Sequence, residues 1–268
     1  MPRNDVTKLP VVLKLPKMDE VSVRRFEYFE DSDGALEVDI YYPPNSLLPE
    51  ASLPVVILVT GHADPTIEAA VGCKLKDSEA YISWAKLIAI SGVVAVTYAN
   101  RNPASDIVSL VNFLQEKSVS LSLDLERVGI WSCSANVPNA LALMISRQAK
   151  IRCATFLYGF MFDRDGNSYV ADTASQSGFA APNAERSIEH MPSDTKLLIV
   201  RAGADKVPGI NQTIDDFCAE ALRLNLPMTM VNHSTAPHSF DIFDTSDLTK
   251  EIIRGVLGFF TSHLRDDG

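Results

Sequence analysis

The chain has 268 residues, of which 46% are hydrophobic and 22% are charged, and its formal net charge is -10 with a pI near 5.0. This acidic balance repels phosphate backbones and anionic lipid, so it argues against nucleic-acid and membrane-surface partners. Length and composition favour one soluble domain that acts on a small molecule, either alone or as a homodimer.

The chain has four cysteines: Cys73, Cys133, Cys153 and Cys218. They are widely spread and form no C-x-x-C pair, which argues against a disulfide framework and against a zinc site. We therefore expect reduced thiols and no metal or other cofactor. The N-terminus lacks a secretory hydrophobic region, because Pro10 and Lys14 break the apolar run of residues 9–15 and Pro16 follows it, and no apolar run is long enough to span a bilayer. These features predict a cytoplasmic protein.

Residues 1–19 contain three prolines and mixed charges, so we expect a tail that lies over the surface. The remaining residues, 20–268, are expected to form a single domain. Residues 21–30 and 36–42 are rich in Val, Phe, Tyr and Ile and flank a turn sequence that ends in Gly34, which predicts an antiparallel hairpin at the sheet edge.

From Pro54 onward, short apolar runs alternate with amphipathic segments, which is typical of an α/β fold with a mostly parallel sheet covered by helices on both faces. The expected strands are residues 55–60, 93–98, 127–132, 153–158, 197–201 and 227–231. Apolar residues at helical spacing predict helices around residues 81–88, 107–114, 137–145, 210–222 and 246–260. The last of these is expected to start at Ser246 or Thr245 as N-cap.

Residues 159–195 interrupt this alternation. They are rich in Gly, Asn, Ser and Asp with little periodicity, and they are longer than an ordinary connection between a strand and a helix. Such insertions form lids or pocket walls, or they are surface excursions. Both interpretations stay open at this point.

One stretch indicates a nucleophile. Strand 127–132 runs through Cys133 and Ser134 directly into a segment rich in Ala and Leu, which predicts strand, sharp turn and helix with Ser134 at the tip. Turns of the G-x-S-x-G type need small residues two places before and after the nucleophile, because strand and helix pass close together there. Ser132 and Asn136 occupy those places, so the motif alone is weak.

The order of further residues adds weight to this motif. Asp205 follows the strand at 197–201, and His238 follows the last strand, at the carboxyl ends where ligands gather in open α/β sheets. Ser, then Asp, then His, each after a successive strand, is the chain order of an α/β-hydrolase triad.

On these residues the chain resembles the α/β-hydrolase superfamily and, within it, the dienelactone hydrolase-like branch, over roughly residues 20–264. Two segments carry the resemblance: residues 124–131 leading into the Ser134 turn, and residues 202–205 followed by 237–240. The chain departs from the family at Ser132 and Asn136, where members usually have Gly, and dienelactone hydrolases proper use a cysteine nucleophile. The resemblance implies an α/β-hydrolase fold and a cofactor-independent serine hydrolase acting on an ester, lactone or thioester.

The expected roles follow from the chemistry of acyl transfer. Ser134 attacks the carbonyl, His238 takes its proton, and Asp205 holds the imidazole. The oxyanion needs two backbone donors, the N–H of Ala135 and an N–H from the loop after the first parallel strand, for which the resemblance favours His62 over Ala63.

Each role has a rival. Cys133 is the rival nucleophile, Asp163 the rival acid and His233 the rival base, and Ser134 also fits a plain helix N-cap region. The rival for the whole chain is a non-catalytic protein of the same fold that binds a small ligand or a partner, with a degraded turn at Ser132 and Asn136.

Overall fold

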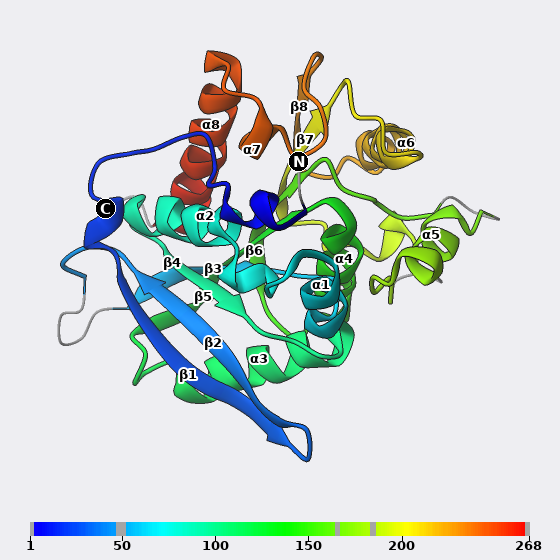
Figure 1. The fold of residues 1–268 in the computed structure, drawn as a ribbon. Helices are drawn as coiled ribbons and strands as arrows, with labels where there is room; N and C mark the ends of the chain where they lie inside the picture. Colours follow the sequence, from blue (N-terminus) through cyan, green and yellow to red (C-terminus); the bar gives the residue numbers. More distant parts are fainter. Residues whose placement is uncertain (1–2, 47–51, 164–166, 183–185, 266–268) are drawn as a thin grey trace.

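The computed structural model describes residues 3–46, 52–163, 167–182 and 186–265, and within them the chain builds one eight-stranded sheet (Figure 1). The strands are β1 Ser22–Asp31, β2 Gly34–Tyr42, β3 Leu53–Leu58, β4 Val94–Tyr98, β5 Leu123–Cys133, β6 Ile151–Leu157, β7 Lys196–Ala202 and β8 Met228–His233. Their spatial order is β1-β2-β4-β3-β5-β6-β7-β8. The hairpin β1–β2 is antiparallel and forms one edge, β2 pairs antiparallel with β4, and all other neighbours are parallel. The predicted fold class is therefore confirmed.

Helices follow the parallel strands. The α-helices are α1 Asp64–Val71, α2 Glu79–Ile90, α3 Pro103–Lys117, α4 Val137–Ser146, α5 Tyr169–Ser177, α6 Ile210–Arg223, α7 Phe240–Phe243 and α8 Asp247–Leu264. Short 3-10 helices are η1 Arg3–Lys8, η2 Met18–Glu20, η3 Leu75–Asp77, η4 Ser134–Asn136 and η5 Ile188–His190. As predicted, Ser246 is the N-cap of α8, where its side chain accepts a hydrogen bond from the N–H of Thr249.

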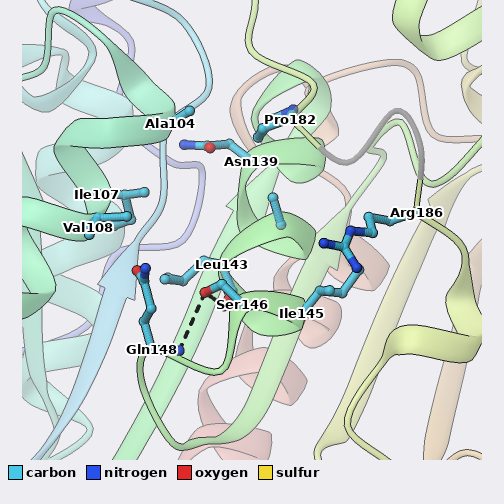
Figure 2. Close-up of a pocket in the computed structure, with 11 residues that line it drawn as sticks. Ala104, Ile107, Val108, Asn139, Leu143, Ile145, Ser146, Gln148, Pro182 and Arg186 are labelled. Carbon is cyan, nitrogen blue, oxygen red and sulfur yellow. Dashed lines mark hydrogen bonds between the residues drawn. The ribbon is translucent and has the colours of Figure 1, made fainter.

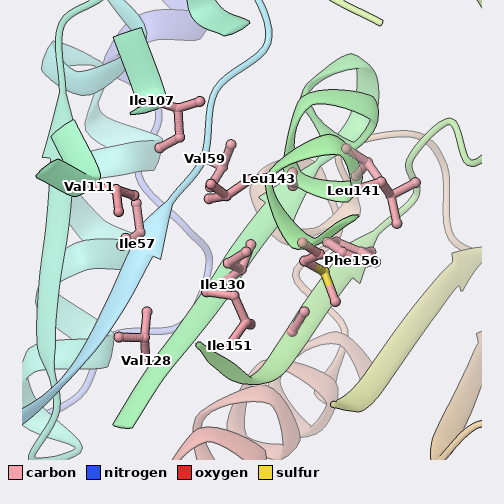
Figure 3. Packing of buried hydrophobic residues seen from close by; sticks show 14 of the residues in the cluster. Ile57, Val59, Ile107, Val111, Val128, Ile130, Leu141, Leu143, Ile151 and Phe156 are labelled. Atoms are coloured by element: carbon pink, nitrogen blue, oxygen red, sulfur yellow. The ribbon is translucent and has the colours of Figure 1, made fainter. Parts of the chain in front are cut away.

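The sheet is buried on both faces because successive side chains of a strand point to opposite sides. Val55 and Ile57 of β3 belong to the core under α3, α4 and α6, whereas Val56 and Leu58 belong to the core under α2 and α8. Figure 3 shows the first of these cores, in which side chains of α3 and α4 meet the apolar face of β3, β5 and β6. This is why the strands read as continuous apolar runs in the sequence.

Two segments differ in detail from expectation. Leu222, which marks the predicted helix at 210–222, is 68% exposed, because Phe217 and Ala221 fill the buried face of α6. The segment predicted as a surface tail contains η1 and η2, and it buries Val11 and Leu13 in the core beside α2. A helix over a sheet face leaves apolar surface at its flank, and the N-terminal segment covers it.

The insertion at residues 159–195 contains α5 and η5 in its described part. No helix within the described residues combines the length and apolar character that crossing a bilayer requires.

Candidate active site

Ser134 lies at the tip of a sharp turn between β5 and α4. Its φ of 55° is in the left-handed region, which costs energy for any residue with a side chain. The turn is tight on its outer side, since a Cβ on Gly159 would lie 2.2 Å from Cγ2 of Val137 and 3.1 Å from the carbonyl oxygen of Ser134. Ser134 itself is half-buried, with its hydroxyl at the carboxyl edge of the sheet.

The two residues that depart from the family pattern fit into this turn. The Ser132 hydroxyl is fully buried and donates to the carbonyl of Val59 at 3.0 Å. The Asn136 amide is also buried and accepts from the N–H of Gly61 at 2.7 Å. Helix α4 begins directly afterwards at Val137, so Asn136 does not displace it.

The three residues predicted to cooperate come together. Ser134 Oγ lies 2.9 Å from Nε2 of His238, and Nδ1 of His238 lies 2.6 Å from Oδ2 of Asp205. An ionised carboxylate only accepts, so Nδ1 carries the proton and Nε2 of the neutral ring is left to accept from the serine hydroxyl. The His238 side chain is 27% exposed, whereas that of Asp205 is fully buried.

Backbone contacts join the loops that carry Asp205 and His238. The N–H of Gly203 donates to the carbonyl of His233 at 2.8 Å, and the N–H of Ala204 donates to the carbonyl of Ala236 at 2.9 Å. The loops approach so closely that a Cβ on Gly203 would lie 2.5 Å from the carbonyl oxygen of Ser234. Parallel strands β7 and β8 end side by side, which is why residues 33 apart in sequence meet here.

The rival residues lie elsewhere or in other roles. The Cys133 thiol is buried, and this burial raises its pKa to about 12, so it is protonated at neutral pH. The carboxylate of Asp163 caps α5 by accepting from the N–H groups of Val170 and Ala171 at 2.6 and 3.0 Å. The rival base, His233, is bonded instead to Asp244 and Thr249 at the start of α8.

The two residues predicted as oxyanion donors, Ala135 and His62, line the same cavity as Ser134. Gly61 allows the loop after β3 to touch the turn, since a Cβ there would lie 2.8 Å from the carbonyl oxygen of Ala135. Across the described parts of the chain, no protein acceptor takes the N–H of Ala135 or of His62. Burial lowers the pKa of the His62 imidazole below its ordinary value, so the ring is neutral at pH 7.

A cavity of about 410 Å³ opens beside Ser134. Helix α1 contributes Ile67 and Val71 to its wall, α2 contributes Trp84, and η1 contributes Val6. None of the described residues of 159–195, for which the sequence left open a lid or pocket wall and a surface excursion, lines this cavity. They contact the loop after β3, where Phe179 pairs with His62.

Sequence reasoning missed Tyr158 and Asp241. The Tyr158 ring packs edge-to-face on His238 with centroids 5.0 Å apart, and its hydroxyl donates to Oδ1 of Asp241 at 2.5 Å. Asp241 is fully buried and also accepts from Nε1 of Trp84 at 2.7 Å. The signal for Tyr158 was its place at the end of a predicted strand, one strand before Asp205; an isolated Asp after His238 gave no comparable signal.

A second cavity, of about 380 Å³, lies between α3 and α4 and is shown in Figure 2. Its lining includes Ile107 of α3, Leu143 of α4, and Pro182 and Arg186 of the insertion. Neither Ser134 nor His238 lines it, so it is separate from the candidate active site.

No protein-family description matches the sequence, and no curated protein matches it. Solved structures do match. A bacterial heroin esterase superposes with a TM-score of 0.70 at 14% identity, over 95% of this chain and 88% of that one. Carboxyl esterase 2 from the mycorrhizal fungus Tuber melanosporum gives a TM-score of 0.70 at 17% identity, over 94% and 89%. A structure from work on two esterases of the fungus Rhizomucor miehei gives a TM-score of 0.68 at 14% identity, over 94% of this chain and 87% of that one. This chain therefore has the α/β-hydrolase fold.

Proposed function

We propose that this protein is a serine hydrolase that cleaves a small ester, lactone or thioester through an acyl-enzyme intermediate. The observation that carries the proposal is the continuous contact from Ser134 Oγ through the His238 ring to the buried Asp205 carboxylate. A serine that is only a helix cap needs neither a left-handed φ nor a histidine at 2.9 Å. The esterase neighbours support the same reaction class by analogy of fold.

The first half-reaction begins at the serine hydroxyl. Ser134 Oγ attacks the substrate carbonyl carbon while Nε2 of His238 takes the hydroxyl proton. Asp205 keeps the proton of the ring on Nδ1 and stabilises the imidazolium that forms. The imidazolium then gives its proton to the leaving alcohol or thiol, and the acyl group stays on Ser134.

Negative charge develops on the carbonyl oxygen during this attack. The N–H groups of Ala135 and His62 stabilise it, because both are backbone donors next to the nucleophile with no protein acceptor among the described residues. The imidazole of His62 is neutral and takes no charge-bearing role.

In the second half-reaction a water replaces the leaving group. His238, neutral again after giving up its proton, accepts a proton from this water as it attacks the acyl carbon. The imidazolium then gives this proton to Ser134 Oγ, which leaves as the hydroxyl, and the acid product is released. The same two donors stabilise the second oxyanion.

The cavity beside Ser134 supports a substrate with a compact apolar group. Its walls include Ile67, Val71 and Trp84, which match an alkyl or aryl portion rather than a sugar or a nucleotide. Between the two narrower activities, the esterase neighbours favour a carboxylesterase, whereas the dienelactone hydrolase-like branch rests on the sequence resemblance alone.

Turnover of p-nitrophenyl acetate by purified protein tests the proposal. We expect the wild type and Cys133→Ala to hydrolyse the ester, and Ser134→Ala to fall to the rate of the buffer. A wild-type rate no higher than that of Ser134→Ala would favour the non-catalytic alternative. Loss of activity only in Cys133→Ala would move the nucleophile by one residue.

A further inference from the structure

Three side chains, one each from the end of β5, from η4 and from α4, bind the backbone of the loop that follows β3 (residues 59–63, the oxyanion loop of the proposed function). Ser132 Oγ donates to the carbonyl of Val59 at 3.0 Å, and Nδ2 of Asn139 donates to the carbonyl of Thr60 at 2.8 Å. Oδ1 of Asn136 accepts from the N–H of Gly61 at 2.7 Å. The three side chains are 0%, 1% and 5% exposed in the order Ser132, Asn139 and Asn136, so little water competes for these bonds.

The orientation of the Asn136 amide is fixed by its partners. The N–H of Gly61 only donates, so the oxygen of the amide must face it, and the amide NH2 then faces the hydroxyl of Tyr81 at 3.0 Å. Both halves of the amide are therefore satisfied, which makes the side chain rigid.

Both backbone polar groups of Gly61 are hydrogen-bonded in this arrangement. Its N–H goes to Asn136, and its carbonyl accepts from the N–H of Ala180 at 2.7 Å. A Cβ on Gly61 would lie 2.9 Å from Cα of Asn136, so loop and turn are in direct backbone contact. The next N–H along the loop is that of His62, the second donor of the proposed oxyanion hole.

We propose that Asn136 is a positioning residue for the oxyanion hole: its amide anchors Gly61 and thereby aims the N–H of His62 at the point that the N–H of Ala135 also faces. The inference rests on the proposed hydrolase function and deepens it. Asn136 stands where members of the family usually have glycine, and the proposal gives this difference a function, because glycine has no side chain to hold the loop. Restoring the family's glycine here lowers the activity.

The test uses Asn136→Gly and Asn136→Ala with a matched pair of substrates, an aryl ester and its thionoester. The sulfur of the thionoester is a weak hydrogen-bond acceptor, so it draws little from the oxyanion donors. We expect kcat for the oxygen ester to fall about 10- to 100-fold in both variants with KM changed less than about threefold. The kcat for the thionoester should fall much less. The ratio of kcat/KM for the oxygen ester to kcat/KM for the thionoester therefore decreases.

Two further variants separate anchoring from folding. Thr195→Val removes a buried hydrogen bond to the carbonyl of Ile151 at the amino ends of β6 and β7, away from Ser134, and it should change neither rate nor ratio. Tyr81→Phe removes the partner of the Asn136 amide NH2 but leaves the bond of its oxygen to Gly61, so it should lower the ratio less than Asn136→Gly does. Thermal melting of every variant reports whether it is folded at the assay temperature.

The inference is overturned if Asn136→Gly keeps wild-type kcat for the oxygen ester, or if both substrates lose rate equally in folded protein. Loss of the ratio in Tyr81→Phe to the same extent would also overturn it, because the Gly61 anchor is intact there. Failure of the proposed function looks different: the wild type itself then shows no turnover that depends on Ser134.

Discussion

Oδ2 of Asp205 lies 2.6 Å from Nδ1 of His238, and the Asp205 side chain is fully buried. Its other oxygen accepts from the N–H of Val207 at 2.9 Å, which fixes the plane of the carboxylate. A buried acceptor in this fixed position decides which nitrogen of His238 carries the proton, and so which one faces Ser134.

Replacing this acceptor with an amide should damage the chemistry while leaving binding intact. An amide group in Asp205→Asn can donate to Nδ1, which favours the wrong tautomer of His238, so we expect kcat to fall by about 10³-fold or more. Steady-state kinetics on a short aryl ester measures this loss. Asp163→Asn serves as control, because Asp163 caps α5, and it should keep kcat within about twofold. Equal losses in the two variants would exclude the assignment of Asp205.

The cavity wall should limit the length of the acyl group. Val71→Trp adds a large ring at the wall beside Ser134, so we expect kcat/KM for p-nitrophenyl hexanoate to fall about tenfold relative to the acetate. Val119→Trp adds the same ring at a site that is 92% exposed and should leave the ratio unchanged. If Val71→Trp also leaves it unchanged, the acyl group lies outside this cavity.

The contact between the Asp205 and His238 loops should not tolerate a methyl group. In Gly203→Ala the new Cβ would lie 2.5 Å from the carbonyl oxygen of Ser234, so the loops must separate. We expect a loss of about 1 to 3 kcal/mol in unfolding free energy together with a large fall in kcat. Gly255→Ala is the control, because no atom lies within 4 Å of its new Cβ in α8, and there alanine should stabilise by up to about 1 kcal/mol. Urea unfolding of both variants measures the change in unfolding free energy. A Gly203→Ala variant with wild-type stability and kcat would contradict the close approach of the two loops.

Asp64, the first residue of α1, should make stability depend on pH. Burial raises the pKa of its carboxyl from 3.8 to about 6, although Oδ2 accepts from the N–H of Asn100 at 2.8 Å. Between about pH 4 and pH 6 the folded protein therefore binds more protons than the unfolded chain, so this group lowers the unfolding free energy as the pH rises. The cost is complete above pH 6 and amounts to about 1 to 3 kcal/mol.

The variant Asp64→Asn isolates this contribution, because its amide oxygen can still accept from Asn100. The unfolding free energy of the variant minus that of the wild type should rise from pH 4 to pH 6 and then stay level. Other titrating groups cancel in this difference. A difference that is flat across the same window would show that the folded and unfolded pKa values of Asp64 are equal.

The sequence was informative where one periodicity dominated a segment. The parallel strands were predictable because burial on both faces makes them continuous apolar runs, and α8 was predictable from Ser246 and its long apolar stripe. Helix α5 was missed because only Val170 and Ala174 of its nine residues are buried, which leaves too short a pattern.

The part of the candidate site that could be predicted from the sequence is the part that depends on the order of the strands. Ser134, Asp205 and His238 each follow a strand end, so the parallel sheet brings them to one edge. The cavity wall was not predictable, because Val6 and Val71 lie in segments whose sequence shows no hydrophobic periodicity that would place them relative to the sheet. The fit of Asn136 was also hidden, since its partner Gly61 lies 75 residues away.

Mapping the site of a fluorophosphonate adduct tests the central claim most directly. The probe phosphonylates an activated serine. Trypsin releases Ser134 in the peptide of residues 128–147, which also contains Ser132 and Ser146, so fragmentation of the labelled peptide in the mass spectrometer identifies the residue. We predict one adduct per chain, on Ser134, absent in Ser134→Ala and strongly slowed in His238→Ala. Folded protein that carries no adduct, or one that persists in Ser134→Ala, would contradict the assignment of Ser134 as the nucleophile.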